Sequence, residues 1–222
     1  MKSVCIRECE EIIDVFSYSY NFPLQSLEIV HLVKLDKLLV LFREEKVTPA
    51  PMVPPGISSH LKEFTICECP NIKQLFTLGV LLNLANLEQI TVFRCLQLEE
   101  IIAEPEASNE VDEEEAKEIL NTICSSNNVI LCDSLNSIEI EECPKLKRLP
   151  LSLRRINGQL SSLPSSLQIK IEKERWELLE WDNHDMKMVL EPCCELRVNA
   201  GRLRLRSVKR RGLGKFGNNW ST

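Results

Sequence analysis

The stretch LKEFTICECPNIKQL, residues 61–75, carries apolar side chains at fixed distances from one another. When Leu61 is counted as position 1 of a nine-residue frame, apolar residues fill positions 1, 4 and 6, and Cys69 fills position 9. Positions 4 and 6 of an extended strand lie on the same side, because side chains alternate with a period of two. The stretch therefore predicts a short strand with one buried face, followed by a turn.

The same frame occurs at five places in the chain of 222 residues. Its members are Met1, Val4, Ile6 and Cys9; Leu24, Leu27, Ile29 and Leu32; Leu61, Phe64, Ile66 and Cys69; Leu87, Ile90, Val92 and Cys95; and Leu135, Ile138, Ile140 and Cys143. The shared template is the leucine-rich-repeat pattern, L-x-x-L-x-L-x-x-N/C-x-L. It predicts an α/β repeat fold, an irregular leucine-rich-repeat solenoid. A curved parallel β-sheet would line its concave side, with loops and short helical turns on the convex side.

The spacing of the frames is uneven. Their first residues are 23, 37, 26 and 48 apart, against roughly 20–29 in this class of repeat. The long intervals indicate insertions or lost strands, and one repeat between the fourth and fifth frames is expected to have lost its strand. After three frames apolar residues continue every third residue, which predicts turns or short 3₁₀ helix on the far side. These residues are Cys69, Ile72 and Leu75; Cys95, Leu98 and Ile101; and Cys143, Leu146 and Leu149.

The ends and the irregular parts complete the predicted organisation. The repeat domain covers 1–195 and includes an acidic loop at about 103–118 with eight carboxylates. An end cap is expected at about 166–195, because a terminal repeat otherwise exposes its core side. Within it, 166–174 alternates as a strand does, and Trp176, Leu179, Met186 and Val189 are the expected covering residues. The basic segment 196–222 is predicted to be a disordered tail.

Charge separates the body of the chain from this tail. The formal charge is −6, and the tail holds eight Lys or Arg and no acid, which leaves −14 for the rest. An acidic body argues against binding nucleic acid, because phosphate recognition needs a positive field. The acids near Met1 leave no apolar run for a signal peptide, and no stretch reaches the roughly 20 apolar residues of a spanning helix. We therefore expect a cytoplasmic protein without a transmembrane segment.

Motifs that could form a catalytic, metal-binding or cofactor-binding site are weak in this chain. Cys67 and Cys69 point to different sides of the predicted strand, which favours packing of Cys69 over a shared metal or redox site. Three other motifs match site patterns in residue type alone. They are the pair Cys193-Cys194, the acids around His184 in EWDNHD (180–185) and the glycines of GLGKFG (212–217). The glycine motif is followed by five residues, too few for a phosphate-binding helix. We predict no catalytic, cofactor-binding or metal-binding residue and no enzymatic activity.

A protein-binding surface is the remaining candidate. Positions 3, 5, 7 and 8 of each frame are expected on the concave face, while positions 4 and 6 are buried. Phe93 and Arg94 are the expected anchors, because aromatic and Arg side chains dominate interface energetics, and the acidic character of the face favours a basic partner. The predicted residues are Ser26, Glu28, Val30, His31, Glu63, Thr65, Cys67, Glu68, Gln89, Thr91, Phe93, Arg94, Ser137, Glu139, Glu141 and Glu142.

The repeats and the blocks between them resemble a known family. The segments 61–104, 131–150 and 175–190 are similar, in this order, to the C-terminal leucine-rich-repeat region of plant intracellular disease-resistance proteins of the coiled-coil, nucleotide-binding type. The resemblance covers about residues 1–195. It implies an innate immune role: recognition of a pathogen effector or a guarded host protein, and autoinhibition through the receptor's own nucleotide-binding module. The Gly-x-x-x-x-Gly-Lys-Ser/Thr loop of that module and the coiled coil are absent from this sequence, and the basic tail departs from the family pattern.

Two other interpretations stay open at the level of sequence. The lost strand and the unrelated tail also fit a truncated, degenerate receptor fragment without independent activity. Ten cysteines leave room for a metal-binding or redox-active thiol protein.

Overall fold

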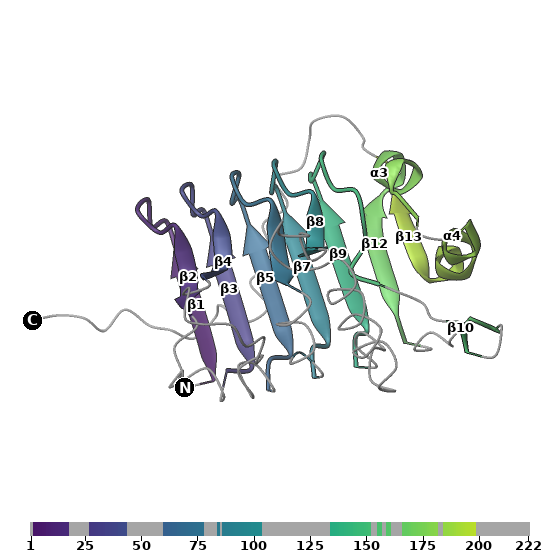
Figure 1. The fold of residues 1–222 in the computed structure, drawn as a ribbon, viewed down its shortest axis with the longest axis horizontal. Coiled ribbons are helices and arrows are strands. Elements are labelled where there is room, and N and C mark those ends of the chain that lie inside the picture. Colours follow the sequence, from purple (N-terminus) through teal and green to yellow (C-terminus); the bar gives the residue numbers. More distant parts are fainter. Residues whose placement is uncertain are drawn as a thin grey trace, which may run out of the picture.

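A seven-stranded parallel β-sheet is the centre of the computed structural model (Figure 1). Its strand order is β1-β3-β5-β7-β9-β12-β13, and each strand is parallel to its neighbours. The bounds are β1 Ser3–Arg7, β3 Ile29–Val33, β5 Glu63–Cys67, β7 Gln89–Phe93, β9 Ser137–Glu141, β12 Gln168–Glu172 and β13 Cys194–Arg197. The structure describes residues 2–17, 27–43, 60–77, 84, 86–103, 134–151, 155–156, 159–160, 166–181 and 184–198.

Four of the five frames coincide with strands of this sheet in the predicted register. Phe64 and Ile66 of β5 pair with Ile90 and Val92 of β7, so positions 4 and 6 stand beside the same positions of the next strand. These residues are at most 1% exposed, as expected for an inward-facing pair. The predicted loss of a strand in the long interval before Leu135 is also confirmed, because β7 pairs directly with β9.

The second frame is shifted by three residues from the prediction. β3 pairs Val30 with Val4 and Leu32 with Ile6, so the frame begins at Leu27 and ends at Leu35. The segment has apolar residues at both sets of positions, and the leucine spacing alone does not separate them. The predicted placement of Val30 on the binding face is therefore wrong, since this side chain is 2% exposed.

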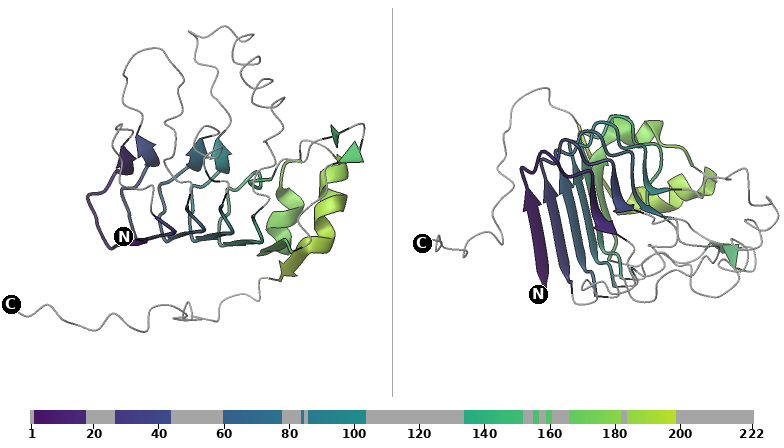
Figure 2. Two further views of the ribbon diagram at one scale, coloured as in Figure 1. Left: turned by 90° about the horizontal axis from the view of Figure 1, so that it is seen from below. Right: turned by 60° about the vertical axis from the view of Figure 1, so that its left-hand side comes forward.

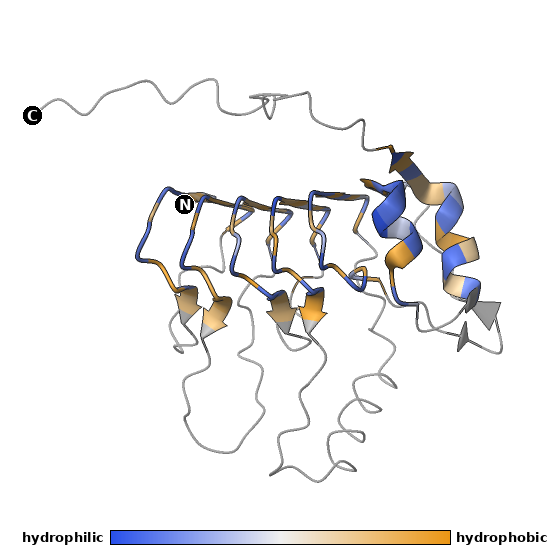
Figure 3. Cartoon of the chain, turned by 90° about the horizontal axis from the view of Figure 1, so that it is seen from above, coloured by the Kyte–Doolittle hydropathy of each residue, from blue (hydrophilic) through white to orange (hydrophobic). Residues whose placement is uncertain are grey.

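A second layer of short strands lies behind the sheet (Figure 2). The expected loops and 3₁₀ turns are only partly correct, because the turns after β1, β3, β5 and β7 lead into short strands that pair two by two. After β9, Arg148 makes only an isolated bridge with Glu100. Hydrophobic residues dominate the short strands in Figure 3. The apolar residues that recur every third position after the frames are buried, with Ile72, Leu98 and Leu146 at 0% exposure. The strands are β2 Asp14–Ser17 paired with β4 Val40–Arg43, and β6 Gln74–Thr77 paired with β8 Glu100–Ala103.

Aromatic rings connect the two layers. Phe16 of β2 lies 5.1 Å from Phe42 of β4, measured between ring centroids, and Phe42 lies 6.5 Å from Phe76 of β6. Phe76 then meets Phe64 of the main sheet edge-to-face at 4.9 Å. Such contacts add about 0.5–1.5 kcal/mol each to the burial of the rings. The Phe64–Phe76 contact therefore fixes the second layer against the sheet.

The C-terminal end of the sheet is covered largely as the sequence predicts. Trp176 is 0% exposed and packs edge-to-face on Trp181 at 4.8 Å. Leu179 and Met186 are buried as expected, whereas Val189 is half-buried and Leu190 beside it takes the interior place. The elements here are α3 Lys173–Leu178, α4 His184–Leu190 and the 3₁₀ turn Glu191–Cys193, with a small hairpin of β10 Arg155–Ile156 and β11 Gln159–Leu160 before them.

The expected boundary at residue 195 falls inside a strand. β13 runs from Cys194 to Arg197, so the sheet includes the first two residues that the charge pattern assigns to the tail. The acidic segment 104–118 and the tail from residue 199 lie outside the described residues. No helix in the described part of the chain is both long and apolar enough to cross a bilayer.

Candidate binding face

The face of the main sheet that is turned away from the second layer is called here the open face. It carries positions 3, 5 and 7 of the frames, because these alternate with the buried positions 4 and 6. The side chains that β3, β5 and β7 contribute are Ile29, His31, Val33, Glu63, Thr65, Cys67, Gln89, Thr91 and Phe93. Most of them are uncharged and partly exposed.

The structure places the predicted binding residues in three groups. Thr65, Thr91 and the other predicted residues at positions 3, 5 and 7 of β5, β7 and β9 lie on the open face, and His31 joins them at position 5 instead of 8. Glu28 lies at position 2, at the start of its strand, and Ser26 lies outside the described residues. Glu68, Arg94 and Glu142 occupy position 8, where the strand has already ended.

Position 8 of each frame has an unusual backbone. Glu8, Lys34, Glu68, Arg94 and Glu142 all have φ between 53° and 55°, in the left-handed region. A non-glycine residue in this region is disfavoured by roughly 1 kcal/mol. The conformation recurs because it turns each N–H of this row towards the next unit: Lys34 N–H donates to the Cys67 carbonyl at 2.9 Å, and Glu68 N–H to the Phe93 carbonyl at 2.8 Å.

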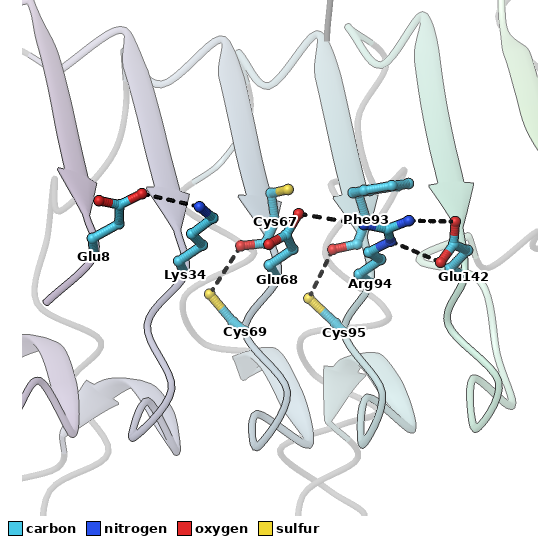
Figure 4. A network of polar contacts seen from close by, with 9 residues as sticks. All are labelled: Glu8, Lys34, Cys67, Glu68, Cys69, Phe93, Arg94, Cys95 and Glu142. Carbon is cyan, nitrogen blue, oxygen red and sulfur yellow. Dashed lines mark hydrogen bonds and ion pairs between the residues drawn. The ribbon is translucent and has the colours of Figure 1, made fainter. Parts of the chain in front are cut away.

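The side chains of this row form a line of alternating charge (Figure 4). Lys34 Nζ lies 3.0 Å from Glu8 Oε1, and Arg94 binds Glu142 through Nε at 2.8 Å and Glu68 through Nη1 at 3.6 Å. The Glu142 carboxylate, by its hydrogen bond and its charge, raises the pKa of Arg94. Arg94 is thus held by both neighbouring units, and its role as an anchor stays a prediction.

A second alternating row lies at position 2, where the strands begin. It reads Lys2, Glu28, Lys62, Glu88 and Asn136 from β1 to β9. Lys2 Nζ is 3.0 Å from Glu28 Oε1, and Lys62 Nζ is 3.2 Å from Glu88 Oε1. The hydrogen bond from Lys2 lowers the pKa of the Glu28 carboxyl. The two charged rows therefore border the open face along both ends of its strands.

The acidic end of the open face is partly neutralised by Arg197, a residue of the segment predicted as the tail. Arg197 of β13 reaches across β12 and binds Glu139 at 2.9 Å, and its guanidinium also contacts Glu141 of the same strand. All three side chains are about one-third exposed. Alternation of apolar and polar residues in Cys194–Val198 is the signal that could have identified this strand. The face is consequently less acidic than expected.

Phe93 is the largest side chain at the uncharged centre of the open face. It stands at position 7 of β7 and is partly exposed. The Arg94 guanidinium lies 4.8 Å from the centre of its ring, a cation–π contact. This contact and the ion pairs of Arg94 hold the ring at a defined place on a rigid strand. Phe93 therefore lies on the face to which the sequence assigns it, and its role as an anchor stays a prediction.

The cysteines divide as the frame predicts. Cys69 is fully buried and its Sγ–H donates to the Cys67 carbonyl at 3.5 Å, and Cys9, Cys95 and Cys143 make the same bond to the residue two before them. Burial raises the pKa of the Cys69 thiol to about 11, and of Cys67, half-buried on the open face, also to about 11. A raised pKa disfavours the thiolate, which is the form that binds metals and exchanges disulfides.

His31 is expected to make the stability of the fold depend on pH. Burial lowers the pKa of His31, although the charge of Glu63 opposes the shift. Below about pH 6.5, the ordinary pKa of histidine, the His31 imidazole is protonated in the unfolded chain but still neutral in the folded chain. Stability is therefore expected to fall as the pH drops through this value. The urea midpoint should decrease more between pH 7.5 and 5.5 for the wild type than for His31→Gln; equal decreases would contradict this assignment.

No ligand-binding chemistry is apparent elsewhere in the described residues. In this part of the chain no three His, Cys, Asp or Glu side chains are grouped so as to hold a metal ion. Of the EWDNHD motif, Asp182 and the His184 side chain lie outside the described residues. The open face is therefore the surface on which a function can be argued.

No protein-family model, curated protein or solved structure matches this chain.

Proposed function

We propose that the open face of the sheet recognises a protein partner, as part of a leucine-rich-repeat solenoid similar to that of plant intracellular immune receptors. The partner would be a pathogen effector, a guarded host protein or the nucleotide-binding module of a receptor. The observation that carries the proposal is an uncharged strip on the open face, formed by Val33, Thr65, Thr91 and Phe93. It lies on β3, β5 and β7 and is bordered by two rows of ion pairs. The sequence resemblance of the repeats supplies the class of partner.

The composition of the strip supports protein recognition over recognition of an ion or a small molecule. Protein interfaces have a core depleted in charge and enriched in aromatic residues, with a polar rim around it. Val33, Thr65, Thr91 and Phe93 form such a centre, and the rows at positions 2 and 8 supply the rim. Each exposed ion pair of the rim contributes only about 0–1 kcal/mol to stability, so its charges remain available to orient a partner.

The binding test compares two apolar residues that differ in location. Phe93→Ala truncates the open face, whereas Leu96→Ala removes an apolar side chain that is 48% exposed in the turn after β7. Truncation of an aromatic at an interface centre typically costs about 1–2 kcal/mol, which is about a 5- to 30-fold loss of affinity. The measurement is quantitative co-purification from plant extract with the wild type and both variants, followed by titration of the recovered protein.

The expected result is a protein retained by the wild type and by Leu96→Ala and lost from Phe93→Ala. A partner retained equally by all three chains would overturn the assignment of the open face. A chain that shows no cooperative thermal transition by circular dichroism would instead support the degenerate-fragment interpretation. The two failures are distinguishable, because the second is measured without any partner.

A further inference from the structure

A side chain of the C-terminal strand lies over the acidic end of the open face. β13 is the second strand after β9 in the sheet (Figure 1), so the two backbones are about 9–10 Å apart at the usual spacing of strands. Arg197 spans this distance: its Nη2 lies 2.9 Å from Glu139 Oε1, and its Nη1 contacts Oε1 of Glu141. One guanidinium thus bridges two carboxylates of a strand that β13 does not adjoin.

The two carboxylates that Arg197 binds adjoin the uncharged strip. In the register of the sheet, Glu139 is the neighbour of Thr91, and Glu141 is the neighbour of Phe93. A stable protein interface buries about 800 Å² on each partner, which is a patch roughly 25–30 Å across, whereas neighbouring strands are about 4.8 Å apart. A partner centred on Phe93 would therefore extend over β9 and meet the side chain of Arg197.

The contact of Arg197 can open without any change in the backbone. Its side chain and those of Glu139 and Glu141 are all about one-third exposed, so the ion pairs face water. Rotation about the side-chain bonds of Arg197 would release both carboxylates, while the backbone of β13 stays paired with β12. Exposed ion pairs stabilise little, so these two pairs together favour the closed arrangement over the open one by only about 2- to 30-fold.

We propose that Arg197 regulates the open face by intramolecular competition. In the free chain its guanidinium occupies Glu139 and Glu141, and a protein partner binds these carboxylates with an arginine of its own once Arg197 has moved away. Arginine is the side chain that fits, because a planar guanidinium donates to two carboxylates at once, as that of Arg197 does here. The competition weakens binding, since only the open fraction of the chain accepts the partner. This inference rests on the function proposed above.

The test uses a small probe of the same chemistry, N-acetyl-L-arginine amide, with the neutral N-acetyl-L-citrulline amide as its control. Titrations of the full-length chain are followed by the backbone amide NMR signals of β7 and β9. Arg197→Gln removes the competing guanidinium, and this variant should bind the arginine probe about 3- to 30-fold more tightly than the wild type. The citrulline probe should shift these signals in neither chain, because it carries no charge.

Two further variants separate competition from a general change of charge. Lys170→Gln removes the same charge from β12, at the residue next to Glu139 in the sheet, and leaves Arg197 in place. It should change the affinity for the arginine probe by less than about twofold at physiological salt, where exposed charges are screened. The double variant Glu139→Gln with Glu141→Gln removes both acceptors and should abolish binding of the probe at this place.

Equal affinity of the wild type and Arg197→Gln for the arginine probe would overturn the proposal, and so would binding that persists in the double variant. Folding is checked by circular dichroism. If Arg197→Gln does not fold, Arg197→Lys decides, because an ammonium lacks the fork that bridges two carboxylates and the probe should again bind more tightly than to the wild type. The probe requires no protein partner, so its failure leaves the comparison of Phe93→Ala with Leu96→Ala unaffected, and failure of the proposed function is measured by that comparison alone.

Discussion

Phe64→Ala is expected to lower the free energy of unfolding by about 3–5 kcal/mol, the range for deleting a buried phenylalanine ring. Phe64 is 1% exposed and meets Phe76 edge-to-face at 4.9 Å. Its removal leaves a cavity between the main sheet and the second layer. Since the free energy of unfolding of a single domain is only about 5–15 kcal/mol, this one change should remove a large part of it. The measurement is urea unfolding followed by circular dichroism.

The matched control is a phenylalanine of the same sheet with the opposite orientation. Phe93 stands on the open face, and its described contact is with the Arg94 guanidinium at 4.8 Å. Phe93→Ala should lower stability by about 1 kcal/mol or less, because an exposed cation–π contact is worth about 0.5–1 kcal/mol. Similar losses for Phe64→Ala and Phe93→Ala would show that the two faces of the sheet are not distinguished as the structure has them.

The second large effect is expected at Glu172, where the regular hydrogen-bond row ends. In the inner units each position-8 N–H donates to a backbone carbonyl of the next strand, at 2.8–3.0 Å. After β9 the acceptor is instead Oε1 of Glu172, 2.6 Å from the Glu142 nitrogen. Helix α3 begins directly after Glu172, so the chain turns away from the sheet at this residue. The carboxylate replaces the backbone acceptor that the next strand would otherwise provide.

Glu172→Ala is expected to cost about 1–3 kcal/mol, since it removes the acceptor of the Glu142 N–H in a part-buried hydrogen bond. The Glu172 side chain is itself buried, at 7% exposure. Glu172→Gln retains an oxygen acceptor and should recover most of this loss. Glu174→Ala, in the exposed first turn of α3, should stay within about 0.5 kcal/mol. Thermal melts of the three variants compare these values, and a loss in Glu174→Ala as large as in Glu172→Ala would refute the capping role.

The sequence predicts the main sheet because its frames combine two independent patterns. Residues such as Ile90 and Val92 alternate as in a strand, and the cysteine at position 9 marks where the strand ends. Both patterns arise from burial, so they are visible without knowledge of the neighbours. The fold follows from them wherever only one choice of frame fits.

The second frame shows where this reasoning fails. Leu27, Ile29 and Leu32 satisfy the apolar pattern in the wrong register, and Leu27, Val30 and Leu32 satisfy it in the right one. The difference lies in the charged positions. Only the frame beginning at Leu27 places Glu28 between Lys2 and Lys62 in the position-2 row. Charge alternation between units was needed to choose the register, and a search by leucine spacing does not include it.

The candidate site was predictable in position but not in charge. That Thr65, Thr91 and Phe93 lie on the exposed face follows from alternation along each strand. That the charge of Glu139 and Glu141 is partly neutralised depends on Arg197, which lies in β13, the second strand after theirs in the sheet. A pairing between strands so far apart in sequence is decided by the three-dimensional order of the units. Local patterns contain no information on it.

The alternation of charge also limits how the chain can change in length. Removal of the single unit that begins at Leu61 would place β3 beside β7, and Glu28 would then face Glu88 while Lys34 faced Arg94. Removal of the two units that begin at Leu27 and Leu61 would instead place Lys2 beside Glu88 and Glu8 beside Arg94, with opposite charges at both rows. Insertions and deletions in this sheet should therefore be tolerated in even numbers of units, so the pair of units, rather than the single repeat, is the element by which such a protein can grow or shorten.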